Sequence, residues 1–234
     1  MSHLNEDSAY DRLRAAILSL EFVPGERLSE RGLESVLGAS RTPIRAALMR
    51  LENEGLTQRD GPGRGWQVTP IDLAEVRAVM EYREALEVAA VALAVERATD
   101  EELAALRELA EVHRDQDDAE TWLRDGGDFH VALARLSRNP FLADGMAGAL
   151  TRLSRTRWLE IRTPQSRAKA RDEHLGIVAA VACRDAGQAA ALVVAHCHGT
   201  RDRVLGYLAE ERRRLRGRGL AIIESSPPPP RLAG

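Results

Sequence analysis

Apolar residues recur at a helical spacing along almost the whole chain, and this period changes clearly at one internal stretch. Residues 56–59 and 66–68 instead have the pattern of two short strands around a glycine-rich turn. Apolar residues three or four positions apart form one face of a helix, whereas short strands around such a turn form a β-hairpin. The sequence therefore predicts a mainly α protein in which a hairpin separates two groups of helices.

Three short helices are predicted before the hairpin. They are expected at about residues 8–20, 29–37 and 40–54. Ser29 and Ser40 are suitable N-caps, and Gly38 and Gly55 are suitable stops, because serine accepts from free helix N–H groups and glycine tolerates the turn that follows. Capped short helices, a tight turn, a third helix and a hairpin are the parts of a winged helix-turn-helix. We assign this fold to residues 1–70.

The second group contains six helices with short connections. They are expected at about residues 71–98, 100–115, 120–138, 141–162, 165–184 and 186–214. Long helices joined by short connections predict an antiparallel all-helical bundle, which we assign to residues 71–215. The remaining residues 216–234 include a run of four prolines, cannot build a core, and are predicted to be disordered.

Composition restricts the setting more than the function. The formal net charge of −3 does not by itself indicate nucleic-acid binding, so the positions of the basic residues must carry that argument. Apolar runs fall short of the about 18 residues of a membrane span, and the N-terminus lacks the pattern of a secretory signal. Cys183 and Cys197 are too few for a disulfide framework. A cytoplasmic protein without membrane contact is therefore expected.

The third helix carries a pattern suited to DNA. Arg41 and Arg45 lie one turn apart, opposite its apolar stripe, and both could reach a major groove. Arginine paired with guanine is the commonest specific base contact. Ser40 and Thr42 at the helix start are placed for phosphate oxygens, and Arg64 at the hairpin tip could enter a minor groove or touch phosphate. Taken alone, the two arginines could equally form a solvated face.

The first seventy residues resemble the GntR family of transcription regulators. The motifs that carry this resemblance are residues 25–31, 37–48 and 51–56, with Ser-Arg-Thr-Pro-Ile-Arg at their centre. The resemblance implies that Arg31, Arg41 and Arg45 contact operator DNA and that Thr42 contacts its backbone. Arg64-Gly65 matches the wing tip, although Gly61-Pro62-Gly63 stands where many members have Asn or a second basic residue.

The second half resembles the FCD domain of the FadR-type branch, over about residues 72–212. Its signatures are Phe129-His130 with Asn139-Pro140, Glu173-His174 with Ile177, and His196 in the last long helix. The resemblance implies a divalent transition metal, such as zinc or nickel, bound by His130, His174 and His196. It also implies a small carboxylate effector beside the metal. Imidazoles from three helices would leave coordination positions open for such a ligand.

The resemblance is incomplete at the fourth metal ligand. The family usually has Asp or Asn four residues before the first histidine, where this chain has Gly126. Asp125 or Asp128 could supply a carboxylate, or the site could contain the three histidines alone.

Three residues are candidates for effector binding. Arg83 matches a family arginine that would hold the carboxylate, although a salt bridge to Glu87 one turn later explains it as well. Arg157 and Trp158 could also line the site.

These features predict a homodimeric regulator, not an enzyme, that binds a near-palindromic operator in double-stranded DNA and responds to a small organic acid. Two alternatives remain open. A metal at the histidines could activate water in a hydrolase joined to a DNA-binding domain, or the bundle could be an inert oligomerisation domain. The sequence does not identify the effector, the operator or the direction of regulation.

Overall fold

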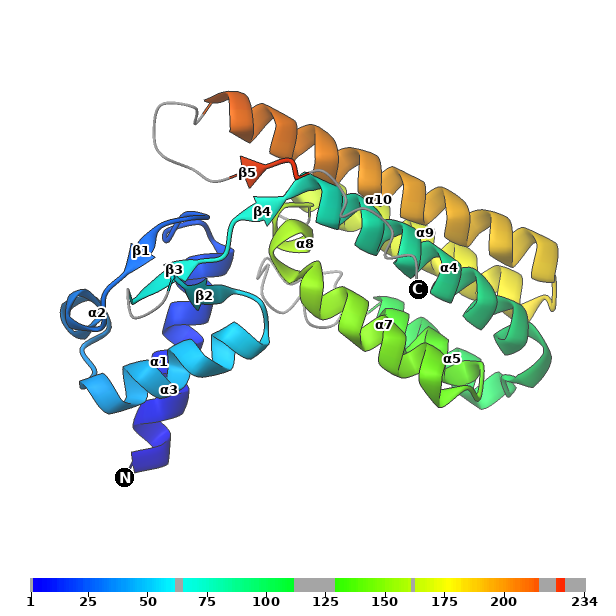
Figure 1. The fold of residues 1–234 in the computed structure, drawn as a ribbon. Coiled ribbons are helices and arrows are strands. Elements are labelled where there is room, and N and C mark those ends of the chain that lie inside the picture. The colour runs from blue at the N-terminus through cyan, green and yellow to red at the C-terminus, as the bar shows by residue number, and fades with distance from the viewer. Residues whose placement is uncertain (1, 62–64, 112–128, 161–162, 215–221, 226–234) are drawn as a thin grey trace, which may run out of the picture. The chain divides into compact units, whose positions relative to one another are not determined.

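A computed structural model describes residues 2–61, 65–111, 129–160, 163–214 and 222–225, without the side chains of residues 2–8, 158–160 and 214 (Figure 1). The chain divides into two compact units. Unit 1 consists of residues 1–77 and 208–234, and unit 2 consists of residues 78–207. The C-terminal segment therefore belongs to the same unit as the N-terminal helices.

Unit 1 contains the predicted helices and hairpin. Its helices are α1 (Ser2–Leu18), α2 (Glu30–Leu37) and α3 (Arg41–Asn53), and the hairpin strands are β2 (Thr57–Arg59) and β3 (Trp66–Val68). A further strand, β1 (Arg27–Leu28), pairs antiparallel with β3 and gives the sheet order β1-β3-β2. This strand was not predicted, because two residues are too few to show an alternating pattern.

The predicted capping residues explain where α2 and α3 begin and end. The Ser29 hydroxyl accepts a hydrogen bond from the Gly32 amide at 3.0 Å, and Gly38 ends α2 in the left-handed region at φ 61°. Ser40 has the extended backbone of an N-cap, but its side chain makes no capping hydrogen bond. The apolar stripe of α3 is buried together with residues of α1 and the sheet. Its burial turns the polar face of α3 outward.

The prediction of a disordered C-terminal tail is wrong for residues 222–225. There β5 (Ile222–Ile223) pairs in parallel with β4 (Ile71–Asp72). The Asp72 carboxylate accepts hydrogen bonds from the backbone N–H and hydroxyl of Ser225, and Glu224 forms ion pairs with Arg77 and Arg212. The proline run dominated the sequence interpretation, whereas two consecutive isoleucines favour a strand once a partner is available. The rest of the tail lies outside the described residues.

Unit 2 is a helical bundle. Its helices are α4 (Leu73–Arg97), α5 (Asp100–Glu111), a helical segment at residues 129–136, α7 (Pro140–Arg152), α8 (Ser154–Glu160), α9 (Pro164–Ala182) and α10 (Ala186–Arg214). α4 and α10 begin and end, respectively, in unit 1. The single helix predicted at 141–162 is wrong, because α7 ends at Arg152, Leu153 is its C-cap, and α8 begins at Ser154. The predicted helices at 100–115 and 120–138 fall partly on residues 112–128, outside the described ranges.

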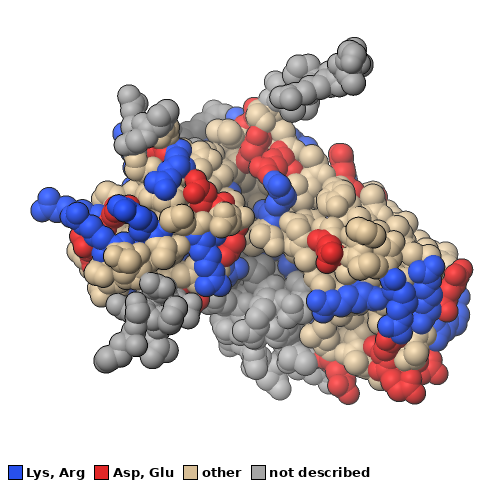
Figure 2. Space-filling model, turned by 60° about the horizontal axis from the view of Figure 1, so that its bottom comes forward, with Lys and Arg blue, Asp and Glu red and all other residues tan. Residues whose placement is uncertain are grey.

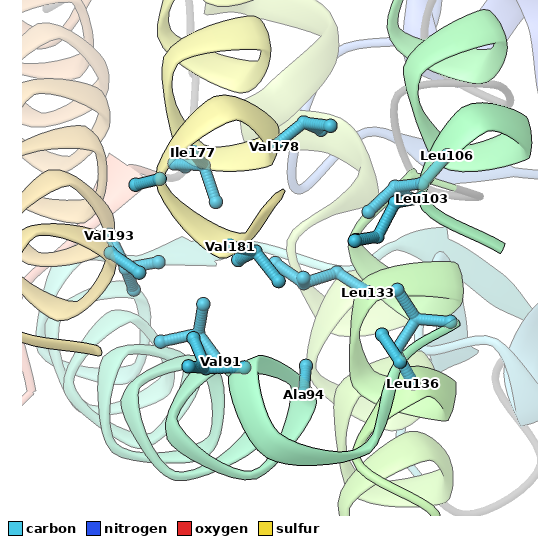
Figure 3. Packing of buried hydrophobic residues seen from close by; sticks show 14 of the residues in the cluster. Val91, Ala94, Leu103, Leu106, Leu133, Leu136, Ile177, Val178, Val181 and Val193 are labelled. Atoms are coloured by element: carbon cyan, nitrogen blue, oxygen red, sulfur yellow. The ribbon is translucent and has the colours of Figure 1, made fainter. Parts of the chain in front are cut away.

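The core of unit 2 forms where α4, α5, the 129–136 segment, α9 and α10 meet (Figure 3). Val91 of α4, Leu133 of the 129–136 segment, Val181 of α9 and Val193 of α10 are fully buried or nearly so, and belong to one apolar cluster. Residues at helical spacing on each segment supply this face, as the sequence period predicted. Among the described residues, no helix is both long and apolar enough to cross a membrane.

The β4–β5 pairing generates a prediction about stability. Ile222 is 7% exposed and its neighbour Ile223 is 43% exposed, so Ile222→Ala should remove far more buried surface than Ile223→Ala. We expect Ile222→Ala to lower the free energy of unfolding of unit 1 by about 2 kcal/mol, with a much smaller effect for the matched control. Urea unfolding measures both variants. Equal effects would contradict burial of the C-terminal strand.

Candidate DNA interface and histidine site

The polar face of α3 forms the candidate DNA interface in unit 1. Arg41, Thr42, Arg45, Ala46 and Met49 line a shallow groove along this helix. All five are exposed, while the opposite face of α3 is buried. Figure 2 shows that basic and acidic side chains lie close together on the surface of the molecule, in agreement with its small net charge.

Arg41 and Arg45 of α3 are each paired with a glutamate of α2. Arg45 donates through Nε and Nη2 to the two carboxylate oxygens of Glu30, both at 2.9 Å. Arg41 Nε lies 3.4 Å from Glu34 Oε2. Exposed ion pairs of this kind contribute little to the stability of the fold, and another anion can easily take the place of the glutamate. They therefore orient both guanidinium groups without preventing contact with DNA.

The other predicted DNA-binding residues also lie on the surface where the structure describes them. Arg31 is exposed on α2, and Ser40 and Thr42 are exposed at the start of α3. Gly65 follows the wing tip with φ 87°, a left-handed conformation that glycine adopts without strain. Arg64 lies outside the described residues.

Sequence reasoning did not single out Glu30, Glu34 or Met49. Glu30 and Glu34 are one helical turn apart, and that spacing was the available signal for a pair of carboxylates on one face of α2. Their alignment with Arg45 and Arg41 depends on how α2 packs against α3, which the sequence does not show.

Unit 2 brings His130, His174 and His196 together. They come from the 129–136 segment, α9 and α10, and all three are buried. One ring nitrogen of each lies within 4.8 Å of the others. Each histidine has buried residues three or four positions along its own helix, so the same helical face that enters the core carries the imidazole inward.

Two carboxylates and one arginine surround the histidines. His130 Nδ1 lies 3.1 Å from Glu87 Oε1, and His196 Nδ1 lies 2.8 Å from Glu173 Oε2. Arg83 and Glu87 form a buried ion pair, with 2.7 Å between Nε and Oε1. The Arg83–Glu87 salt bridge considered from the sequence is therefore present, and both partners belong to the histidine site.

His174 differs from the other two histidines. Its ring stacks on Phe129 with the ring centroids 4.1 Å apart. Its Nε2 atom is buried and has no hydrogen-bond partner among the described residues. A buried polar atom without a partner lowers the stability of the folded protein. This nitrogen is therefore suited to a ligand that supplies the missing contact.

Burial keeps the imidazoles of His130 and His174 neutral. Removal from water lowers the pKa of His130 to about 3, and it lowers the pKa of His174 well below its usual value. Burial alone would raise the pKa of Glu87, but the charge of Arg83 and the contacts with His130 and His196 together outweigh burial and hold that pKa well below its usual range. Neutral imidazoles are the protonation state that binds metals, so the donor set fits a transition-metal ion.

The other predicted site residues are less clearly placed. Arg157 is buried on α8, while the side chain of Trp158 is not described. Asp125 and Asp128, the candidate fourth ligands, lie outside the described residues. Sequence reasoning noted Glu87 only as a salt-bridge partner of Arg83. It quoted Glu173 only as part of a motif, although both carboxylates contact the histidines.

A winged helix-turn-helix with exposed arginines on its third helix, followed by a helical domain with a buried polar site, has the plan of a DNA-binding transcription regulator. Residues 5–68 match the family described as bacterial regulatory proteins, gntR family, and residues 78–199 match the FCD domain. The chain belongs to the gntR family, in its FadR-type branch, and is a regulator, not an enzyme.

Known proteins with the same plan include the Nta operon transcriptional regulator of Aminobacter aminovorans. It is 36% identical over 195 residues, which cover 80% of this chain and 89% of that protein. The structure of E. coli McbR/YncC matches with a TM-score of 0.66 at 23% sequence identity, and the match covers 86% of this chain and 97% of that chain. The structure of a GntR regulator from Rhodococcus sp. RHA1 matches with a TM-score of 0.63 at 21% sequence identity, and the match covers 88% of this chain and 99% of that chain. These two structures share the fold.

The lowered pKa values of His130 and His174 generate a prediction about pH. Their pKa values are depressed in the folded state, so below the ordinary value of 6.5 the unfolded chain binds more protons. Stability should therefore fall as the pH drops below 6.5, by about 1 kcal/mol per histidine between pH 6.5 and 5.5. Urea unfolding of chelator-treated protein at several pH values measures the loss.

His174→Gln should make this pH dependence shallower, because it removes one of the groups that must charge on unfolding. The exposed His198 provides a matched control, and His198→Gln should change the profile less than His174→Gln does. A His174→Gln profile parallel to that of the wild type would show that His174 is not held neutral by the fold.

Proposed function

We propose that this regulator binds a two-fold operator as a homodimer and that a small carboxylate, bound beside a divalent transition metal in unit 2, changes its operator affinity. The observation that supports the sensing part is the convergence of three buried histidines, one with a ring nitrogen lacking a partner. An inert bundle would have no physical reason to bury this set of imidazoles together. Such a regulator would act in the cytoplasm, because its operator DNA is there.

In the DNA-binding part, Arg41 and Arg45 read base edges in the major groove. Their guanidinium groups are exposed and one turn apart, and the glutamates that hold them can be exchanged for guanine or phosphate acceptors. Arg31, Ser40, Thr42, Arg64 and Gly65 contact the DNA backbone or an adjacent minor groove. The Ser40 hydroxyl, which makes no capping bond, is available to a phosphate oxygen.

In the sensing part, His130, His174 and His196 would hold the metal, which would supply a Lewis-acid contact for a carboxylate. Glu87 and Glu173 contact the Nδ1 atoms of His130 and His196 and so fix the orientation of both rings. Arg83 is the cation within the site, and a carboxylate effector would pair with it. Arg157 and Trp158 are further candidates for effector contact, and Asp125 or Asp128 for a fourth ligand.

The homodimer is supported by an exposed apolar patch on unit 2. Phe141 of α7 is 83% exposed and Tyr82 of α4 is 50% exposed. Gly145 lies one turn after Phe141, and the Tyr82 hydroxyl lies close against it, so the two aromatic residues flank one surface. Aromatic side chains exposed together are typical of an interface.

We expect Arg41→Ala and Arg45→Ala each to weaken operator binding by about tenfold or more, since each guanine contact provides about 1–3 kcal/mol of discrimination. Affinity for unrelated DNA should fall less. Arg107→Ala, which removes an exposed arginine from α5, is the charge-matched control and should bind normally. Footprinting, with the mass in solution from light scattering, measures these effects. Wild-type footprints by both variants would refute the assignment of α3, and a monomer would contradict the dimer.

The metal has its own test. We expect purified or reconstituted protein to contain about one zinc or nickel ion per chain, and His174→Ala to lose it together with the response to carboxylates. Basal operator binding should persist, because the DNA-reading helix belongs to unit 1. His198→Ala is the control, since His198 is exposed and pairs with Glu84. Elemental analysis and gel-shift titrations decide the question. A wild-type protein that takes up no metal would refute this part of the proposal.

A further inference from the structure

The guanidinium group of Arg83 lies at the centre of the histidine site. Arg83 Nη2 lies 2.9 Å from Nε2 of His130 and 3.1 Å from Nε2 of His196. One terminal nitrogen of the guanidinium thus contacts two imidazoles that come from different helices. Arg83 is itself almost completely buried.

The hydrogen bonds around the two rings indicate which nitrogens carry protons. Glu87 and Glu173 are acceptors, so the Nδ1 atoms of His130 and His196 are the donors to them. A neutral imidazole that has its proton on Nδ1 has its lone pair on Nε2. Both lone pairs therefore point toward Nη2 of Arg83, which donates to them.

These Nε2 lone pairs are the ones that a metal ion would need. Each Nε2 lone pair can accept a hydrogen bond from Arg83 or bind a metal ion, but it cannot do both at once. The guanidinium remains charged in proteins, so it keeps donating as long as it stays in place. Arg83 therefore has to withdraw from His130 and His196 before their Nε2 atoms can bind a metal. The Arg83–Glu87 pair one turn along α4 provides a charge partner that does not depend on the histidines.

We propose that Arg83 is the resident cation of the histidine site. It holds His130 and His196 in place when no metal is bound, and it competes with metal for the same nitrogens. The site thus has a self-filled state and a metal-loaded state, and Arg83 has a different position in each. Because Arg83 lies on α4, which follows β4 directly in the chain, the exchange involves the helix that leaves unit 1. This inference rests on the metal site of the proposed function.

The test compares zinc affinities of chelator-treated protein, measured by competition with a chromophoric chelator. Arg83→Met removes the competing cation, and zinc should bind about tenfold more tightly than to the wild type. Arg83→Met combined with Glu87→Gln leaves the net charge of the chain unchanged, so tighter binding cannot be a general charge effect. This double variant is compared with Glu87→Gln alone, because Glu87 orients His130 and its loss by itself weakens metal binding. The double variant also avoids a buried unpaired carboxylate if the single variant folds poorly.

Arg203→Met is the matched control. Arg203 lies 3.6 Å from Glu173, so this change removes a nearby positive charge without affecting the Nε2 contacts, and zinc affinity should change by less than about twofold. Melting temperatures give a second measurement. Without metal, the Arg83 variants should melt below the wild type, and zinc should raise their melting temperatures by more.

The outcomes separate this inference from the proposed function. If Arg83→Met binds zinc no more tightly than the wild type, and the double variant no more tightly than Glu87→Gln alone, the role of Arg83 is overturned and the metal site stays intact. Zinc binding by the Arg83 variants but not by the wild type would support the competition with Arg83 and would overturn the metal site of the proposed function. Absence of binding in all variants would overturn both.

Discussion

The buried ion pair between Arg83 and Glu87 is the interaction on which the interior of unit 2 depends. Charges removed from water are tolerated only when they are paired and hydrogen-bonded, and here two histidines complete that network. The network connects α4 to the 129–136 segment and to α10. His174 adds α9 through its contacts with the neighbouring rings. The polar cluster therefore constrains four of the five helical segments that form the apolar core.

The two units use arginine in opposite ways because their surroundings differ. On α3, the exposed guanidinium groups of Arg41 and Arg45 pair with glutamates in water, where such pairs are weak and can be exchanged for DNA. In unit 2, Arg83 is shielded from water, so each contact that it makes is costly to break. The surface pairs suit reversible recognition. The buried pair suits a site that changes state only when another ligand compensates for the lost contacts.

Much of the architecture could be predicted because it depends on local signals. Ser29 and Gly38 determine the ends of α2, and the alternating runs before and after the wing tip form β2 and β3. The two strands that the sequence did not predict each need a distant partner. Strand β1 exists because β3 lies beside it, and Ile222–Ile223 becomes a strand because β4 is available, 151 positions earlier in the chain. The break between α7 and α8 at Leu153 has no glycine or proline to mark it.

The candidate sites show the same division. The sequence alone determined which residue types could read DNA and which histidines could share a ligand, because motif spacing assigns Arg41 and Arg45 to one helix face and the histidines to separate helices. Only the tertiary structure decided which groups meet. Glu30 and Glu34 face the arginines through the packing of α2 on α3, and Arg83 reaches Nε2 of His130 and His196, residues 47 and 113 positions away. Helical periodicity specifies the direction of a side chain around its own axis, whereas the partner at the other end of a contact depends on how the helices pack.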